Sequence, residues 1–213
     1  MLKLHHLGHS QSERIVWLCE ELGLTYELLH YARDPVTRLS PPALKALHPL
    51  GAAPLLEDGE LLLAESAAIV EYLITRHGGG RLRPGPQDSN YADFLYWFHF
   101  ANGNLQPAML RYMTVNRAQL PADHALPASV KDRLGKLLAL MEQRLVTVPY
   151  LAGREFSAAD IMNVFSLSTM RLFQPVDLAP YPVIRAYLQG IGERPAYQLA
   201  MRKGDPNLTP LLC

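Results

Sequence analysis

Apolar residues follow two different spacings in the first 77 positions of the chain. At the start they alternate with polar residues, so that Leu2, Leu4 and His6 share one face of a short predicted strand that ends at Gly8. Within residues 15–22 the apolar positions then recur at helical spacing, and a glycine follows as a stop signal. A strand that leads directly into a helix is a typical start of an α/β domain.

The alternation of strand and helix signals continues for another fifty residues or so. The pattern predicts a second strand over 25–29, a brief helix over 41–47, a hairpin made of 54–56 and 61–64, and a helix over 66–76. Asp58-Gly59 carries the hairpin turn. The order β-α-β-α-β-β-α is that of a thioredoxin-like domain.

Strand signals stop at residues 78–87, which are dense in glycine and proline. We therefore predict a thioredoxin-like domain over 1–79, a linker over 80–87 and an all-helical domain over 88–213. The helices expected in the last part cover 88–116, a segment that opens at Pro127, 157–172, 180–190 and 194–202. Gly103 and Pro107 are expected to bend the first of these helices. The predicted fold class is α/β followed by all-α.

Composition narrows the class of protein. Of the 213 residues, 49% are hydrophobic and 19% are charged, as in ordinary globular chains. Twenty Lys and Arg residues balance twenty Asp and Glu residues, which argues against nucleic acid as a main partner. No apolar run reaches the roughly eighteen residues of a membrane span. The first ten residues hold no signal-peptide pattern and Cys19 and Cys213 form no CxxC pair, so we expect a cytoplasmic protein.

Residues 8–12 (GHSQS) join the first predicted strand to the first helix. A hydroxyl there lies near free backbone N–H groups and the positive helix end, which both favour an anion. A simpler interpretation is that Ser10 or Ser12 only caps the helix. The segment also approaches the hydrolase motif G-x-S-x-G, but Ser12 replaces the last glycine, and ten residues cannot supply the preceding sheet and oxyanion-hole loop.

Two further junctions carry candidate chemistry. Residues 50–54 (LGAAP) place Pro54 at the mouth of a strand, where it lacks a ladder donor. A cis Ala53–Pro54 bond would leave the Ala53 backbone free to pair with an extended peptide, although the dipeptide alone favours trans. Residues 64–68 (AESAA) offer N–H and hydroxyl groups to a carboxylate, and Glu65 to an ammonium group; a capped helix with a solvated glutamate is the simpler interpretation.

The segment FSAADI at 156–161 is a folding signal rather than a chemical one. Ser157 and Asp160 form the Ser-x-x-Asp version of the capping box, and Phe156 and Ile161 are placed as a hydrophobic staple. We expect this segment to start a helix and assign it no chemistry.

Taken together, these segments resemble the soluble glutathione transferases. The segments are SQSERIVWLCEELGLTYEL, LHPLGAAPLLEDG, LLLAESAAIVEYL and YLAGREFSAADIMN. They are most similar to the bacterial and fungal serine-type group, whose motifs read roughly S-R-S-x-R-x-x-W-L-L-E-E-L and H-P-L-G-K-x-P. Each motif is moderately specific, but the match covers nearly the whole chain in the right order.

The resemblance implies roles for individual residues. Ala53 and Pro54 become a cis-proline turn that pairs with the cysteinyl backbone of glutathione. Glu65 and Ser66 hold the γ-glutamyl end. Ser10 is the hydroxyl beside the glutathione sulfur, and Ser12 is the second candidate for that role.

Two residues of the expected glutathione site depart from the family pattern. Gln11 stands where these relatives usually carry arginine, and Ala52 where they usually carry lysine. Both changes weaken the expected hold on the glycyl carboxylate.

The chain also lacks the cysteines of two related groups. Relatives that isomerise maleylacetoacetate show S-S-C-S, and cysteine-type glutathione oxidoreductases need a cysteine in the first βα turn; this chain has neither.

We therefore expect a detoxifying transferase that conjugates glutathione, its co-substrate, to small apolar electrophiles without a metal. Asn102, Gln106 and Leu110 are the expected electrophile site. In similar proteins an acidic residue matches Asn102 and reaches the glutathione amine of the partner subunit. Two alternatives stay open: a glutathione-dependent peroxidase, disulfide reductase or dehalogenase, and a non-catalytic binding protein of the same fold.

The resemblance also implies a homodimer, in which the α/β domain of one subunit packs on the long helix of the other. Tyr91, Phe94, Trp97 and Phe98 lie on that helix. We interpret them as more apolar surface than one helix face can bury within its own chain.

Overall fold

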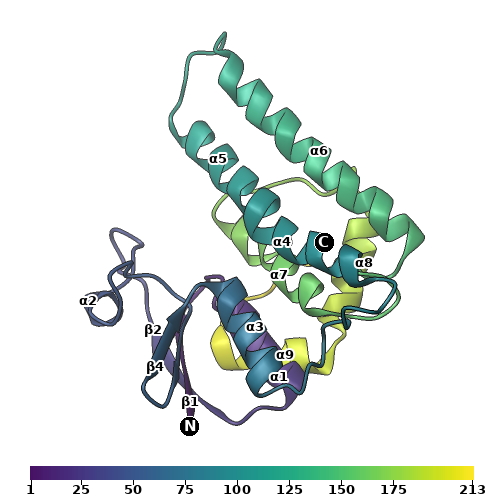
Figure 1. Ribbon diagram of the computed structural model, residues 1–213. Helices are drawn as coiled ribbons and strands as arrows, with labels where there is room; N and C mark the ends of the chain where they lie inside the picture. The colour runs from purple at the N-terminus through teal and green to yellow at the C-terminus, as the bar shows by residue number, and fades with distance from the viewer. The chain divides into compact units, whose positions relative to one another are not determined.

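The computed structural model describes all residues from 1 to 213 (Figure 1). The chain forms two compact units. The first contains Met1–Leu82 and Glu193–Pro210, and the second contains Arg83–Gly192 and Leu211–Cys213. The expected domain ranges stay a prediction, to which the structure adds that the last helix packs with the first unit.

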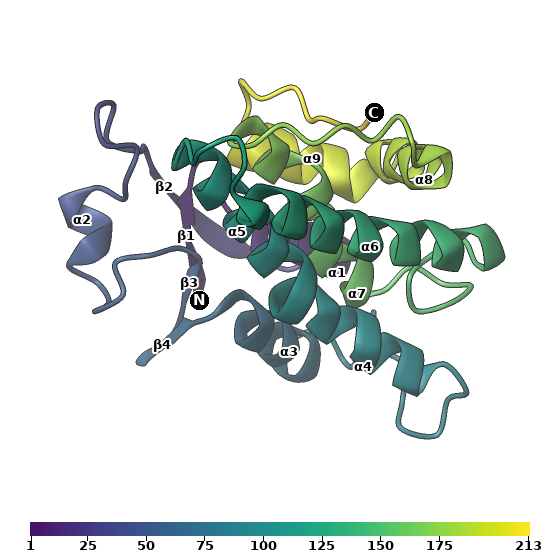
Figure 2. The ribbon, with the colours of Figure 1, turned by 90° about the horizontal axis from the view of Figure 1, so that it is seen from above.

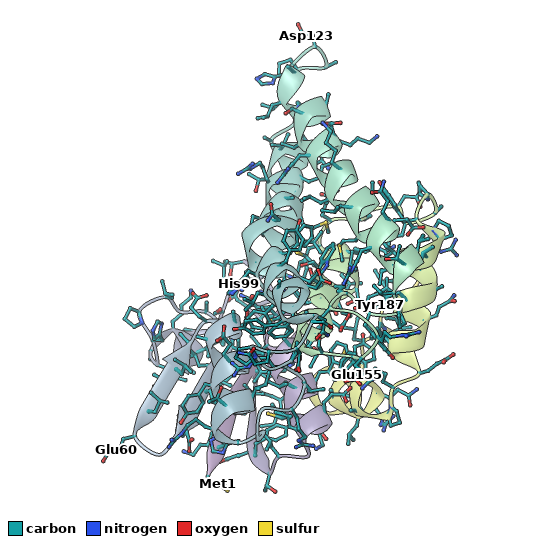
Figure 3. The ribbon with its side chains drawn as sticks, turned by 45° about the vertical axis from the view of Figure 1, so that its right-hand side comes forward. Met1, Glu60, His99, Asp123, Glu155 and Tyr187 are labelled. Atoms are coloured by element: carbon teal, nitrogen blue, oxygen red, sulfur yellow. The ribbon has the colours of Figure 1, made fainter.

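The first unit is built on a mixed four-stranded sheet. Its elements are β1 (Leu2–Leu7), α1 (Glu13–Leu22), β2 (Tyr26–Tyr31), α2 (Pro42–Lys45), β3 (Leu55–Asp58), β4 (Leu61–Ala64), α3 (Ser66–Arg76) and α9 (Pro195–Gly204). The strand order is β2-β1-β3-β4. β1 runs parallel to β2 and antiparallel to β3, while β3 and β4 form the expected hairpin, with Glu60 at its tip (Figure 3). This is the predicted thioredoxin-like order.

Side-chain alternation along β1 decides which helix covers which face of the sheet. Leu4 pairs with Leu56 on the face that packs against α1 and α3. Leu7 and Leu55 lie on the opposite face and pack with Leu44 of α2. His6 is therefore on the same face as Leu4, which is the face that α1 and α3 cover.

Helix α9 returns the end of the chain to α1. The ring of Tyr197 meets Trp17 edge to face at 4.9 Å between centroids. Arg194 makes hydrogen bonds to both carboxylate oxygens of Glu21, at 2.8 and 2.9 Å. These contacts bury α1 on two sides and place residue 205, directly after α9, beside β1.

The second unit consists of helices, which confirms the predicted fold class. They are α4 (Tyr91–Phe100), η1 (Ala101–Leu105), α5 (Gln106–Arg117), α6 (Ala125–Thr147), α7 (Ala158–Leu167), η2 (Thr169–Leu172) and α8 (Pro182–Gly192). α5 and α6 pack side by side, with Asp123 in the loop that joins them (Figures 2 and 3). No helix of the structure is both long and apolar enough to cross a membrane.

The long helix predicted over 88–116 is interrupted where Gly103 and Pro107 were expected to disturb it. The five residues of η1 form a π-helix between α4 and α5. Pro107 lacks the N–H that a regular α-helix would use there, so it favours a change in the hydrogen-bond pattern.

Two other helix boundaries differ from the prediction. α6 begins at Ala125, before Pro127, because the side chain of His124 caps it by accepting a hydrogen bond from Leu126 N–H. The helix predicted over 157–172 ends at Leu167, and a 3-10 turn follows after Ser168.

The predicted capping box at the start of α7 is confirmed. The Ser157 N–H donates to Asp160 Oδ2 at 2.9 Å, while the Ser157 hydroxyl accepts from Ala159 N–H at 3.3 Å. Tyr187 from α8 donates a further bond of 3.0 Å to Asp160 Oδ1. This carboxylate therefore joins two helices of the second unit.

The aromatic residues of α4 correct the reason given for a dimer. Phe94, Trp97 and Phe98 are only 2%, 4% and 1% exposed, so they are buried within the chain itself. The exposed apolar side chains of α4 are Leu95 and Tyr96. The prediction misassigned the faces of the helix because α4 is apolar nearly all round, and such a helix has no clear stripe.

Candidate active site

The loop between β1 and α1 carries Ser10 and Ser12, and both hydroxyls are buried. The two Oγ atoms lie 2.7 Å apart, a hydrogen-bonding distance at which either atom can be the donor. Ser10 Oγ also accepts from the backbone N–H of Ser12 at 3.2 Å. Ser10 thus has the geometry of a hydroxyl held at the start of α1.

Of the two serines that were candidates to cap α1, Ser12 does not do so with its side chain. Ser12 occupies the N-cap position but makes no capping bond. Its Oγ turns back to β1, where it accepts from Leu7 N–H at 3.2 Å and lies 2.9 Å from His6 Nδ1. It is Ser10, two residues earlier, that binds a backbone N–H at the helix start.

A buried carboxylate holds the same loop from behind. Asp205 Oδ1 accepts from the backbone N–H of His9 at 3.0 Å, and Oδ2 lies 3.2 Å from His6 Nε2. Burial acts to raise the pKa of Asp205, but the close contact with the His6 ring and the N–H of His9 outweigh it, so the pKa lies below its usual value. Asp205 is therefore an anion at neutral pH.

Arg33 fixes the backbone of the loop from the side of β2. Its Nε donates to the Gly8 carbonyl at 3.0 Å and its Nη2 donates to the His9 carbonyl at 3.1 Å. A side chain on Gly8 would meet Asp205 Oδ1 at 3.2 Å, so the close approach of the carboxylate favours glycine. Ser10 follows directly on this braced backbone.

A fully buried guanidinium joins the starts of α1 and α3. Arg14 Nη1 donates to Gln11 Oε1 at 3.0 Å and to Ser66 Oγ at 3.1 Å. Ser66 Oγ donates in turn to Gln11 Oε1 at 3.3 Å. Burial lowers the pKa of Arg14 to about 9, against the opposing charge of Glu13, so the group remains a cation at neutral pH.

All six residues expected to bind glutathione line one open pocket. They come from three segments: Gln11 beside α1, residues 52–54 before β3, and Glu65 and Ser66 at the start of α3. The pocket is completed by His48, Leu50 and Ala64. Ser10 and Ser12 are not among its lining residues.

Two backbone features mark the walls of this pocket. The Ala53–Pro54 peptide bond is cis, as predicted. Glu65 has φ +70°, a conformation rare for residues other than glycine, and it immediately precedes α3. A strained residue of this kind is common at ligand sites, and here the exposed Glu65 lines the pocket.

The three residues expected to bind the electrophile lie in the second unit. Asn102 is in η1, Gln106 begins α5, and Leu110 is one turn further along α5 with 43% of its surface exposed. Their spacing of four residues places them along one side of this helical stretch. Their roles stay a prediction.

Sequence reasoning missed four residues of this region: His6, Arg14, His48 and Asp205. Arg14 and His48 lie within the quoted motifs. Their spacing does not indicate that Arg14 is buried or that His48 lines the pocket. His6 resembles an ordinary inward-facing strand residue. Asp205 lies 196 positions from His9, and no local pattern connects them.

Comparisons with known proteins identify the family. Residues 1–75 match the "Glutathione S-transferase, N-terminal domain" family and residues 100–195 the "Glutathione S-transferase, C-terminal domain" family. Glutathione S-transferase 3 of Schizosaccharomyces pombe is 30% identical over 224 residues, covering 99% of this chain and 91% of the relative. Glutathione S-transferase 1 of Saccharomyces cerevisiae is 30% identical, with 95% of each covered. The crystal structure of a glutathione S-transferase from Actinobacillus pleuropneumoniae has a TM-score of 0.88 and 34% identity, covering 96% of this chain and 93% of that one.

The fold and the pocket thus define a two-part protein of the glutathione S-transferase class. The chain belongs to the glutathione S-transferase family and is a glutathione transferase. The resemblance stated from the sequence motifs is confirmed at the level of the family, and membership of the serine-type group stays a prediction.

Proposed function

We propose that this transferase binds glutathione in the pocket beside α1 and α3 and ionises the glutathione thiol with the hydroxyl of Ser10. The observation that carries the proposal is the convergence of Gln11, Glu65, Ser66 and the Ala53–Pro54 turn on one pocket. The starts of two helices meet here, which suits carboxylate groups, while the Glu65 carboxylate suits an ammonium group. Glutathione carries both kinds of charge.

The chemistry follows from the thiol pKa. A free thiol has a pKa near 8.5, so only a few per cent is thiolate at pH 7. A hydrogen bond to a charged acceptor contributes about 1.5–3 kcal/mol, so one donated by Ser10 lowers the thiol pKa by roughly one to two units. The thiolate then forms an S–C bond with the electrophile, whose leaving group departs with the bonding electron pair.

The remaining parts of the proposal concern the second unit and the assembly. Asn102, Gln106 and Leu110 form the electrophile site, and the apolar Leu110 suits an apolar electrophile. The active protein is a cytoplasmic homodimer; Leu95 and Tyr96 are the exposed apolar residues of α4 available to a partner. A sedimentation mass near the 23.8 kDa of one chain at micromolar concentration would contradict the dimer.

The test is an ultraviolet titration of bound thiolate in the wild type, Ser10→Ala and the control Ser40→Ala. We expect Ser10→Ala to raise the pKa of bound glutathione by about one to two units and to lower turnover of a chlorinated aromatic at pH 7 by about tenfold or more. Ser40→Ala removes a hydroxyl that lies outside the pocket and leaves both values unchanged. An unchanged thiol pKa in Ser10→Ala rejects Ser10 as the activating group.

A further inference from the structure

Four polar side chains form a continuous buried chain behind the β1–α1 loop. Ser10 and Asp205 are 6% and 7% exposed, and Ser12 and His6 are fully buried. Ser10 Oγ lies 2.7 Å from Ser12 Oγ, which lies 2.9 Å from His6 Nδ1. On the other side of the ring, His6 Nε2 lies 3.2 Å from Asp205 Oδ2. This last contact is not an aligned hydrogen bond and becomes an ion pair when His6 is protonated, and neither atom has another polar partner.

The fixed backbone donors leave this chain two complete arrangements of its protons. Ser12 Oγ always accepts from Leu7 N–H, and Ser10 Oγ always accepts from Ser12 N–H. In the inward arrangement Ser10 donates to Ser12, and Ser12 donates to a neutral His6. Ser10 then has one lone pair left to accept a proton from an approaching thiol.

The outward arrangement reverses every bond. His6 carries a proton on Nδ1 and donates it to Ser12, Ser12 donates to Ser10, and the Ser10 hydroxyl donates to a thiolate. Each oxygen again has two acceptor bonds and one donor bond, so no buried group loses a partner. The competing bond from Ser12 Oγ to the Leu7 carbonyl is longer, at 3.3 Å.

We propose that the chain Ser10–Ser12–His6 carries the thiol proton of bound glutathione to His6 Nδ1, where Asp205 stabilises the resulting imidazolium. The S–H bond breaks, each hydroxyl passes on one proton and receives another, and the N–H bond on His6 forms. The net result is a thiolate, a cationic His6 and no proton released to solvent. His6 and Asp205 never touch glutathione and act only through the two serines. This inference rests on the proposed function.

The charges around His6 favour this end state. Asp205 faces the ring from the end of α9 and holds its charge because its pKa is lowered. His9 Nε2 lies 3.7 Å from Asp205 Oδ1, and the Arg33 guanidinium, which also feels the charge of Asp205, opposes a further cation. His30 of β2 meets the His6 ring edge to face at 5.6 Å, and burial together with His6 lowers the pKa of His30, so it stays neutral. The Asp205 carboxylate lies in direct contact with His6 Nε2, at 3.2 Å.

The experiment counts protons. Glutathione is titrated into the full-length protein at pH 7 in buffers of different ionisation enthalpy, while thiolate is read by ultraviolet absorbance. In the wild type we expect thiolate to form with no proton released. In His6→Asn, whose amide can donate to Ser12 but cannot accept a proton, we expect release of about one proton per thiolate formed. In Asp205→Asn, which can still accept from His9 N–H, we expect the thiol pKa to rise by about one unit.

The matched control is His30→Gln, which removes an imidazole beside His6 without touching the chain of hydrogen bonds. It should behave as the wild type in both measurements. Release of about one proton per thiolate by the wild type overturns the relay but leaves Ser10 as the activating hydroxyl. Glutathione binding without any thiolate in the wild type overturns the proposed function and the relay together. Equal proton release by wild type and His6→Asn also overturns the relay.

Discussion

The Nη1 atom of Arg14 donates a hydrogen bond of 3.1 Å to Oγ of Ser66, which lies 52 positions further along the chain. Through this contact a buried cation joins the start of α1 to the start of α3, and the pocket lies between the two helix starts. The geometry of the pocket therefore depends on a side chain that does not line it.

Replacement of Arg14 tests that dependence. Arg14→Met removes the hydrogen bonds that Arg14 Nη1 donates to Gln11 Oε1 and Ser66 Oγ, so we expect the free energy of unfolding to fall by about 2–4 kcal/mol. Arg14→Lys keeps the charge but cannot reach both oxygens in one plane, so it should retain the fold and bind glutathione about tenfold more weakly. Urea unfolding and calorimetric titration measure the two effects. Arg76→Met, at the exposed end of α3, is the control, and equal behaviour of the two positions would contradict this role.

Some parts of this site could be predicted from the sequence, and others could not. The β1–α1 junction, the cis-proline turn and the start of α3 each have local signals, and the six predicted pocket residues do line one pocket. Arg14 has no such signal, because its position in α1 reads as part of an amphipathic helix until α3 and the neighbouring loop bury it. Burial of a charged residue is a tertiary property, and helical spacing carries no record of it.

The same limit explains the errors in the last helices. Asp205 reaches His6 only because α9 turns back onto α1, and the sequence after Gly192 reads like any other surface helix. Trp97 and Phe98 were expected on a dimer face because α4 is apolar on nearly every side; which side the chain buries depends on the packing of α7. Local patterns predicted the positions of the helices and strands. They did not predict which other elements pack against each one.

A lysine at position 52 should strengthen glutathione binding. Ala52 is exposed and lines the pocket, at the place where relatives of this sequence usually carry lysine. A cation there would attract the glycyl carboxylate by about 0.2–1 kcal/mol, which corresponds to a dissociation constant lower by a factor of roughly 1.4 to 5. The gain should shrink as salt is added, since the site is open to solvent.

Calorimetric titration of Ala52→Lys and of the control Ala68→Lys measures this effect. Ala68 is exposed on α3 but does not line the pocket, so its lysine tests for a general effect of charge. Tighter binding in both variants would mean that net charge, rather than position 52, is responsible.

Restoring an acidic residue at position 102 should also tighten binding if the homodimer brings Asn102 to the glutathione amine of the partner. A carboxylate holds an ammonium better than an amide does, by about 1 kcal/mol at a partly exposed site, or roughly fivefold in the dissociation constant. The control is Asn104→Asp, because Asn104 lies two residues on and accepts a bond of 2.8 Å from Arg133 instead. Equal dissociation constants for wild type and Asn102→Asp would place position 102 outside the site.

Asp205 should also make stability depend on pH. Its pKa is lower in the folded protein than in the unfolded chain, where an aspartate titrates near 3.9, so its charge stabilises the fold above about pH 4. That contribution is lost as the pH falls from about 4 through the lowered pKa of the folded state. The loss of stability caused by Asp205→Asn should therefore be larger above about pH 5 than below about pH 4. Urea unfolding of both proteins across this range measures the difference, with Asp123→Asn, in the exposed loop between α5 and α6, as the control. A difference that grows towards low pH would mean that the pKa of Asp205 is raised in the folded protein, and that it is not held as an anion by His6 and the His9 N–H.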